Sequence, residues 1–497
     1  MDLRFNIKDY ETAKISCRGR EMTFRCYEHI PYCAAPEDAA IQRLSVYIPE
    51  DYFNGRRVNG YSAQTAPIFL ANDVGGYMPG HESRPGIKKL PPYLAPEYST
   101  YDIMSWALMN GCVVVSCGVR GRGMKDPHGK NIGIAPAAIT DLKAAVRYLR
   151  YNSQIIPGDT ERIISNGTSA GGALSALLGC TGNHPDYIPY LENIGAADAR
   201  DDIFAASCYC PITELDHADM AYEWEFAGIY ECRGLKLIPP DGNNGWRSYA
   251  ITRTLTAERQ ELSVRLCVAF PGYINSLDLK DENGRSLALG ADGQGSFKEY
   301  LANGIVKSAQ EELKRLSLSL QAGYISERYQ IIRKRFANTS ASPEECGAFS
   351  ICDGQICGVD LDAFARFRTR MKPAPAFDSI ENNTPENELF GSETADRRHF
   401  TRFSYEEDTL GGLLAEPEQV KLMDPICYID DDAAVKAGHF RILHGAADRD
   451  TSLAISEILG LKLSMACIDA RVIHPWGVPH DGDYDPVQLM EWINSVV

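Results

Sequence analysis

The sequence predicts an α/β fold in which a mostly parallel sheet is flanked by helices and interrupted by one long insertion. Three features predict it. Short apolar runs rich in β-branched residues alternate with helical periodicity, a polar and irregular stretch follows, and strand-like runs resume near the end of the chain. The length of 497 residues fits one large domain with an insertion, or about three domains of ordinary size.

Apolar runs in the first half of the chain have the length and the boundaries of buried strands. Each is bounded by Gly, Pro, Asn or Asp residues, which punctuate secondary structure. Four of them precede residue 167: 44–50, 66–71, 112–117 and 162–166. A fifth run, at 203–212, continues the series.

A helix is predicted between the third and fourth runs. Apolar residues recur there on one face of a 3.6-residue period: Ile139, Leu142, Val146 and Leu149. Lys143, Arg147 and Arg150 lie off this face, and we expect them to contact solvent. Strand, helix and strand in this order favour parallel pairing, because parallel neighbours need a crossover connection.

The regular series stops after residue 213. Residues 214–400 are polar and irregular, with a hairpin-turn signal at Asn283-Gly284 and a charged helical stretch near 306–337. This composition predicts an insertion into the α/β domain.

Strand-like runs return at 440–443 and 470–473. A last helix is predicted after Asp485-Pro486, because Asp can cap a helix and Pro suits its first turn. Together these patterns predict one discontinuous α/β domain, interrupted by the insertion: 1–213 and 401–497, with 214–400 between them.

The charge balance argues against two classes of partner. The 50 Lys and Arg residues against 67 Asp and Glu give a net charge of −17, which would repel nucleic acid and anionic membranes. No apolar run approaches the 18 or so residues that span a bilayer, and the start MDLRFNIKDYET lacks a signal peptide's features. We expect a cytoplasmic protein, unless a leader has been removed. The sequence does not indicate an oligomeric state.

Fifteen cysteines are scattered along the chain, mostly inside apolar runs, and we interpret them as reduced core residues. The pairs Cys208/Cys210 and Cys352/Cys357 lack the C-x2-C spacing of zinc sites and have no histidine pair nearby. We therefore expect neither a structural metal nor a cofactor.

Residues 167–171, Gly-Thr-Ser-Ala-Gly, have the G-x-S-x-G form of a nucleophile elbow. In an elbow the serine sits on a cramped strand-to-helix turn that needs small neighbours. The motif follows a predicted strand and opens a predicted helix, which is the required setting. The alternative is a glycine-rich turn with a solvated Ser169.

A serine nucleophile needs a base that is held by an acid, and in the α/β-hydrolase fold the chain order is serine, acid, histidine. The loop 444–450, His-Gly-Ala-Ala-Asp-Arg-Asp, follows a predicted strand and offers two carboxylates. We assign Asp448 as the acid and His480, on the loop before the last helix, as the base. His474 ends a strand and is expected to be a packed or supporting residue, and His444 is expected to bond to backbone.

The remaining histidines lie outside the positions expected of a catalytic base. We interpret them as surface or structural residues: His29, His81, His128, His184, His217, His399 and His439.

An acyl-transfer site also needs donors for the oxyanion. The amide of Ala170, after the nucleophile, supplies one. Residues 72–77, Asn-Asp-Val-Gly-Gly-Tyr, follow a predicted strand, and we assign the second donor to Gly76, with Gly75 as the alternative. An ordinary tight turn is the other interpretation of this loop.

The elbow, the Asn-Asp-Val-Gly-Gly-Tyr loop, the acid loop and the terminal His480 together resemble bacterial tannases, which are similar in fold to feruloyl esterases. The resemblance spans nearly the whole chain, including the inserted lid. It implies an α/β-hydrolase fold with the triad Ser169, Asp448 and His480.

The resemblance also implies three residues that hold the galloyl hydroxyls: Lys372 and Glu386 from the insertion, and Asp450. Gallate presents three adjacent hydroxyls, each a donor and an acceptor, so an ammonium and carboxylates are suitable partners. Glu388 and Glu381 lie close to Glu386 and are alternatives to it. Without the resemblance, solvated loop charges would be the simpler interpretation.

With what the resemblance implies, the sequence predicts a serine esterase that cleaves galloyl and protocatechuoyl esters through an acyl-enzyme, with a small phenolic ester as its partner. Within the same chemistry a feruloyl esterase or general carboxylesterase is the alternative, and a serine peptidase is a weaker one. A catalytically silent binding protein of the same fold is the alternative from another class.

Overall fold

The chain is described by a computed structural model, in which two compact units are each assembled from separate stretches of sequence. The residues described are 2–17, 20–86, 102–238, 247–319, 347–353 and 355–497. The first unit consists of Met1–Pro211, Glu381–Arg441 and Gly482–Val497. The second consists of Ile212–Ile380 and Ile442–Asp481. The role of 214–400 as a lid stays a prediction.

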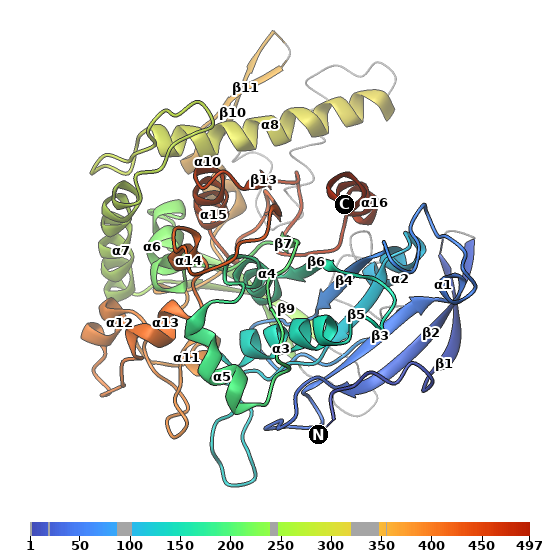
Figure 1. Cartoon of the computed structure of the whole chain (residues 1–497). Coiled ribbons are helices and arrows are strands. Elements are labelled where there is room, and N and C mark those ends of the chain that lie inside the picture. Colours follow the sequence, from blue (N-terminus) through green and yellow to red (C-terminus); the bar gives the residue numbers. More distant parts are fainter. Residues whose placement is uncertain (1, 18–19, 87–101, 239–246, 320–346, 354) are drawn as a thin grey trace. The chain divides into compact units, whose positions relative to one another are not determined.

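A large mixed sheet forms the centre of the first unit (Figure 1). Its strands are β1 (Glu11–Cys17), β2 (Arg20–Pro31), β3 (Arg43–Pro49), β4 (Pro67–Asn72), β5 (Val113–Cys117), β6 (Asp159–Thr168), β7 (Ala205–Tyr209) and β12 (His439–Leu443), which passes into the second unit. Their spatial order is β1-β2-β3-β5-β4-β6-β7-β12. Strand β4 pairs in parallel with β5 and β6, and β6 with β7, whereas β1, β2, β3 and β5 pair antiparallel in turn. The predicted α/β fold is confirmed.

Both faces of this sheet are buried. On one face Phe69, Val114 and Ile164 pack against helices α2 (Ile103–Met109) and α16 (Pro486–Val496). Their neighbours along the strands point to the other face and are also fully buried: Ile68, Val113 and Ile163. This burial on both sides explains why the strands are apolar runs rather than alternating patterns.

The remaining helices of the first unit flank the sheet or connect its strands (Figure 1). They are α1 (Glu50–Phe53), α3 (Ala137–Tyr151), α4 (Ala170–Cys180), α5 (Ile188–Asn193), α11 (Pro385–Leu389), α12 (Arg402–Glu407), α13 (Pro417–Lys421) and α14 (Ile426–Ile429), with a 3₁₀ turn at Pro185–Tyr187.

Helix α3 forms as predicted, but the expectation that its cations contact solvent is wrong. Lys143 is fully buried and pairs with Asp201 at 2.8 Å, and Arg150 donates to the carbonyl of Asp202 at 2.9 Å. Burial lowers the pKa of Lys143, although the charge of Asp201 acts against this. Periodicity could not show that a second layer of chain covers this side of the helix.

The second unit is mainly helical. Its elements are α6 (Leu215–Glu225), β8 (Glu231–Ile238), β9 (Arg247–Thr254), α7 (Ala257–Ser276), α8 (Ser296–Ser319), β10 (Phe349–Cys352), β11 (Gln355–Val359), α10 (Leu361–Arg368), α15 (Leu453–Met465) and β13 (Asp469–Ile473). Helix α8 begins ten residues before the predicted stretch, whose part at 320–337 lies outside the described residues. The amide of Gly284 donates to the carbonyl of Asp281, so the predicted turn forms. It is closed by an isolated antiparallel bridge between Lys280 and Ser286 instead of by the two strands of a hairpin.

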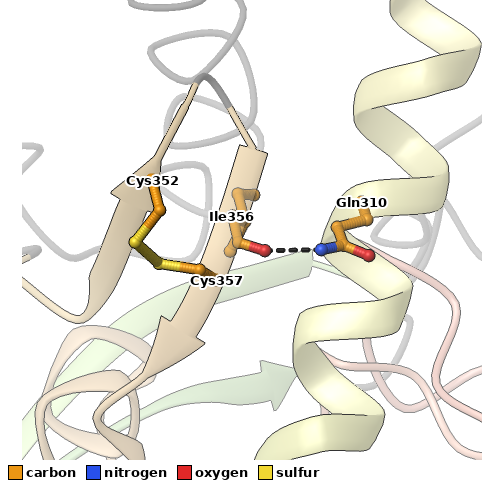
Figure 2. Close-up of a disulfide and its surroundings, with 4 residues drawn as sticks. All are labelled: Gln310, Cys352, Ile356 and Cys357. Carbon is orange, nitrogen blue, oxygen red and sulfur yellow. Dashed lines mark hydrogen bonds between the residues drawn. A yellow bond between two sulfur atoms is a disulfide. The ribbon is translucent and has the colours of Figure 1, made fainter.

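The hairpin of β10 and β11 carries a disulfide between Cys352 and Cys357, whose Cα atoms are 5.8 Å apart (Figure 2). Gln310 of α8 donates to the carbonyl of Ile356 beside it. The interpretation of all cysteines as reduced core residues is therefore wrong here, because the two strands bring these thiols within bonding range. Cys427 and Cys467 depart from it too, since both are exposed thiols.

Helix α16 begins at Pro486 as predicted, but Asp485 does not cap it. The Asp485 carboxylate accepts from the hydroxyl of Tyr209 at 2.6 Å and pairs with Arg441. Of the helices in the described ranges, none combines the length and the apolar character needed to cross a membrane.

Candidate active site

The turn between β6 and α4 has the geometry of a nucleophile elbow. Strand β6 ends at Thr168, α4 begins at Ala170, and Ser169 between them has φ +58° and ψ −119°. A positive φ is uncommon for a residue other than glycine and marks a constrained position. The amide of Ser169 donates to the carbonyl of Tyr209 at 2.9 Å, which ties the turn to β7.

The glycines of the motif are required by close backbone contacts. A Cβ atom on Gly167 would lie 2.4 Å from the carbonyl oxygen of Gly171, and one on Gly171 would lie 2.9 Å from the carbonyls of Asn72 and Val74. No side chain fits at these distances. The G-x-S-x-G pattern is therefore explained by the packing of the elbow itself.

The predicted oxyanion loop lies against the start of α4. The amide of Gly171 donates to the carbonyl of Val74 at 2.9 Å, and the side-chain amide of Asn72 donates to the carbonyl of Gly171 at 3.0 Å. These two bonds fix the loop beside the elbow that carries Ser169 and Ala170.

Within this loop, a tight turn sets the orientation of the Gly76 amide. The amide of Met78 donates to the carbonyl of Gly75 at 3.0 Å, and Gly76 and Tyr77 have φ of +54° and +55°, as in a type I′ turn. Because the carbonyl of Gly75 points into the turn and the peptide is trans, the N–H of Gly76 points out of it. This orientation suits an oxyanion donor.

Arg122 holds the same turn from outside. Its Nε donates to the carbonyl of Gly76 at 2.7 Å, and its backbone amide donates to the carbonyl of Tyr77 at 2.8 Å. Its guanidinium also pairs with Glu388, which a second cation, Arg397, contacts at 2.7 Å. Sequence reasoning missed Arg122, because nothing in its neighbourhood distinguishes it from a solvated arginine.

The two predicted glutamates have different surroundings. Burial alone would raise the pKa of Glu388, but Arg397 and Arg122 hold it below its usual range. Glu386, on the same helix α11, is 7% exposed and lies near Tyr77, whose pKa is raised by burial and by the charge of Glu386. Glu388 is thus held by two arginines, and Glu386 stays the residue that the resemblance implies for the ligand contact.

In the second unit, Asp448 and His480 form a hydrogen-bonded pair. His480 Nδ1 lies 2.7 Å from Asp448 Oδ2, and the aspartate is fully buried. Burial alone would raise the pKa of Asp448, but the imidazoles of His480 and His444 hold it well below its usual range. An ionised acid on Nδ1 leaves Nε2 as the atom of His480 that can accept a proton.

The loop around Asp448 is held by its own backbone. The amides of Asp450 and Thr451 donate to Asp448 Oδ1 at 2.7 and 3.3 Å. His444 Nε2 lies 3.1 Å from Asp448 Oδ2, and its Nδ1 lies 2.8 Å from Ser456 Oγ. The expectation that His444 bonds to backbone is therefore wrong, because its side chain is directed at the acid.

His474 is buried, as expected of a packed residue. Its Nδ1 donates to the carbonyl of His444 at 3.1 Å, and its Nε2 lies 2.7 Å from Glu457. Both of its ring nitrogens therefore have partners within the second unit.

Lys372 and Asp450 form an ion pair in the second unit, with Nζ 2.9 Å from Oδ1. The ammonium also lies 3.9 Å from the centre of the Phe377 ring. Burial alone would raise the pKa of Asp450, but the charges of Lys372 and His480 hold it below its usual range. The pair combines a cation donor, a carboxylate acceptor and an aromatic surface, which together suit a hydroxylated ring.

The predicted site residues thus fall into two groups. The second unit brings Asp448 and His480 together, and Lys372 and Asp450 together. The first unit contains the other predicted residues: Ser169, Ala170, Gly76 and Glu386.

Comparisons with known proteins identify the relatives of this chain. A family model described as BD-FAE matches residues 128–204, and the comparison with curated proteins gives no match. Among solved structures, a Lactobacillus plantarum tannase is 38% identical with a TM-score of 0.89, and covers 100% of both chains. A Fusobacterium nucleatum tannase is 40% identical with a TM-score of 0.88, covering 100% of this chain and 99% of its own.

A third similar structure is a tannin acyl hydrolase in complex with ethyl gallate, 38% identical with a TM-score of 0.86 and covering 99% of this chain and 98% of its own. Full-length identity at this level confirms the resemblance found in the sequence. The chain belongs to the bacterial tannase family, and it is an ester hydrolase of the tannase and feruloyl esterase type with an α/β-hydrolase fold.

Proposed function

We propose that this protein hydrolyses galloyl esters, and protocatechuoyl esters, through an acyl-enzyme formed on Ser169. The observation that carries the proposal is that one loop of the second unit places the acid of the Asp448–His480 pair two residues from Asp450, which is paired with Lys372. The groups for proton transfer and for ring recognition thus share one loop. Similar structures of a tannin acyl hydrolase in complex with ethyl gallate and with 3,4-dihydroxybenzoate support the choice of galloyl and protocatechuoyl as the acyl groups.

In the proposed reaction, His480 Nε2 takes the hydroxyl proton of Ser169 while the Ser169 oxygen bonds to the ester carbonyl carbon. The amides of Gly76 and Ala170 donate to the oxyanion that forms. The protonated His480 then gives its proton to the departing alcohol oxygen as the ester C–O bond breaks. Water then gives a proton to His480 as its oxygen bonds to the acyl carbon. The bond from this carbon to the Ser169 oxygen breaks, His480 returns the proton to that oxygen, and the free acid leaves.

Recognition of the acyl group is assigned to Lys372, Asp450 and Glu386. Each ring hydroxyl of gallate can both donate and accept, so a cation and two carboxylates can satisfy adjacent hydroxyls. A charge-assisted bond of this kind contributes about 1.5–3 kcal/mol, which is a factor of roughly 10 to 150 in kcat/KM.

The test is a panel of methyl gallate, methyl protocatechuate, methyl ferulate and methyl benzoate, measured for the parent and for Lys372→Met, Glu386→Gln and Asp450→Asn. Each variant should lose kcat/KM for gallate by the factor above and little for benzoate, whose ring has no hydroxyl. Equal losses on gallate and benzoate would show that the three residues support the fold instead. If Asp450→Asn abolishes all activity while Asp448→Asn is tolerated, the two carboxylates have exchanged roles.

A feruloyl esterase is the second candidate, and the BD-FAE match over 128–204 is the observation that favours it. The same panel decides between them, because a feruloyl esterase would prefer methyl ferulate. A silent binding protein would hydrolyse none of the esters and would leave Ser169 unlabelled by a fluorophosphonate.

A further inference from the structure

The hydroxyl of Tyr222, on helix α6 of the second unit, connects the two segments that carry Lys372 and Asp450. It donates to the carbonyl of Arg449 at 2.8 Å. It accepts the backbone amides of Met371 and Lys372, each at 3.1 Å. The side chain is fully buried, so water does not substitute for any of these three partners.

These three partners are backbone groups next to the ion pair, whereas the pair itself is formed by side chains. Arg449 lies between Asp448 and Asp450, and the amide of Lys372 is the backbone of the paired lysine itself. One hydroxyl therefore links the backbone that carries the cation to the backbone that carries the carboxylate. Two further bonds join the same segments, since Arg368 donates to the carbonyl of Asp448 at 2.8 Å and Arg449 donates to the hydroxyl of Thr369 at 2.8 Å.

The same face of α6 anchors the rest of the segment around Lys372. Asp219 accepts the amides of Ala376, Phe377 and Asp378 at 2.6, 2.8 and 3.0 Å. Glu223 accepts from two nitrogens of Arg370 at 2.6 and 2.9 Å. Residues 219, 222 and 223 lie at i, i+3 and i+4, so they share one face of the helix.

We propose that Tyr222 is a positioning residue for acyl selectivity: its hydroxyl fixes the distance between Lys372 and Asp450 that matches adjacent ring hydroxyls. This inference rests on the proposed function, in which that pair reads the galloyl ring. Without the hydroxyl, three buried backbone groups lose this partner and fewer bonds hold the two segments in register. Misplacement of about 1 Å in a binding site can cost on the order of 100-fold in rate.

The test compares Tyr222→Phe with Tyr187→Phe. The control removes an equally buried hydroxyl, which donates to the carbonyl of Leu422 at 2.8 Å in the first unit. Both variants should lose thermal stability, because each removes a buried hydroxyl that is hydrogen-bonded to backbone. Only Tyr222→Phe should lower the ratio of kcat/KM for methyl gallate to kcat/KM for methyl benzoate, by roughly 10- to 100-fold. A ratio equal to that of Tyr187→Phe would overturn the proposal.

Two further variants keep the result decisive. If Tyr222→Phe does not fold, Asp219→Asn weakens the anchor of the same segment and should lower the same ratio by a smaller factor; an unchanged ratio then overturns the proposal. Lys372→Met separates the two levels of the argument. If Lys372→Met leaves the ratio unchanged, the proposed function fails and the role of Tyr222 fails with it; if it lowers the ratio and Tyr222→Phe does not, only the role of Tyr222 fails.

Discussion

His444 and Asp448 are joined by a buried contact of 3.1 Å between Nε2 of the imidazole and Oδ2 of the carboxylate. The same oxygen is 2.7 Å from His480 Nδ1, so two imidazoles converge on one atom of the acid. Ser456 Oγ lies 2.8 Å from the other nitrogen of His444. Because an ionised carboxylate can only accept, Nε2 of His444 is the N–H that donates to Asp448.

Replacing His444 should therefore slow the chemistry rather than weaken binding. In His444→Phe the acid loses one buried donor and is held less firmly against His480. We expect kcat to fall roughly 10-fold on gallate and benzoate alike, with little change in KM. His184→Phe is the matched control, because it removes a buried histidine that lies 3.1 Å from Asp431 in the first unit. Equal kcat values for the two variants would contradict the role of His444.

The triad should act as a unit. Ser169→Ala should lower kcat by about 10⁴-fold or more, and adding His480→Ala should cost little further, because neither residue works without the other. Single-turnover measurements on methyl gallate check both variants. Additive losses in the double variant would mean that the two residues do not share one step.

Activity should fall on acidification because of His480 and not because of Asp448. The pKa of Asp448 is held well below its usual range, so this acid stays ionised through the mildly acidic range. An ordinary imidazole gains its proton near about pH 6.5, and protonated His480 cannot act as a base. We expect kcat/KM to fall about tenfold per pH unit on the acidic side. A flat profile between about pH 5 and 8 would exclude His480 as the base.

The pair of Lys372 and Asp450 should also affect stability at low pH. The pKa of Asp450 is lower in the folded chain than in the unfolded chain, so its ionised form stabilises the fold above the unfolded value of about 3.9. That contribution is lost as the pH falls below this value. Asp450→Asn should therefore lose less free energy of unfolding than the parent between about pH 5 and 3, as measured in urea. A steeper loss in Asp450→Asn would contradict the direction of the shift.

Arg122 should act on the oxyanion loop and not on selectivity. Arg122→Met removes the donor that holds the carbonyl of Gly76, and kcat should fall about 10- to 100-fold for every ester in the panel. Arg397→Met is the control, because it removes the other cation on Glu388 and leaves Gly76 untouched. A loss confined to gallate would show that Arg122 belongs to the acyl pocket.

Strong local patterns predicted the framework of the first unit. Strands β3, β4 and β5 match the apolar runs closely, α3 follows the predicted periodicity, and α4 begins after the elbow as predicted. The elbow was predictable because a Cβ atom on Gly167 or Gly171 would lie only 2.4 to 2.9 Å from backbone oxygens of the first unit. Such a requirement for glycine leaves a short sequence motif.

The supporting contacts of the site were not predictable. Tyr222, Arg122 and His444 act through partners more than ten residues away or through buried side chains, and no periodicity records such pairs. The prediction that Lys143 contacts solvent was wrong for the same reason, since its buried partner Asp201 lies 58 residues further along the chain. Local sequence gives the elements and the motif, whereas the tuning of a site depends on pairs that only the folded chain brings together.

The distribution of the thiols allows two sites to be labelled with fluorophores. Among the described cysteines only Cys427 and Cys467 are exposed thiols, one in each unit. Burial raises the pKa of thiols such as Cys33 and Cys112, so they react slowly with maleimides. With Cys17, Cys267 and Cys346 changed to serine, a fluorescent donor and acceptor on the two exposed thiols would follow any movement between the units during turnover by energy transfer.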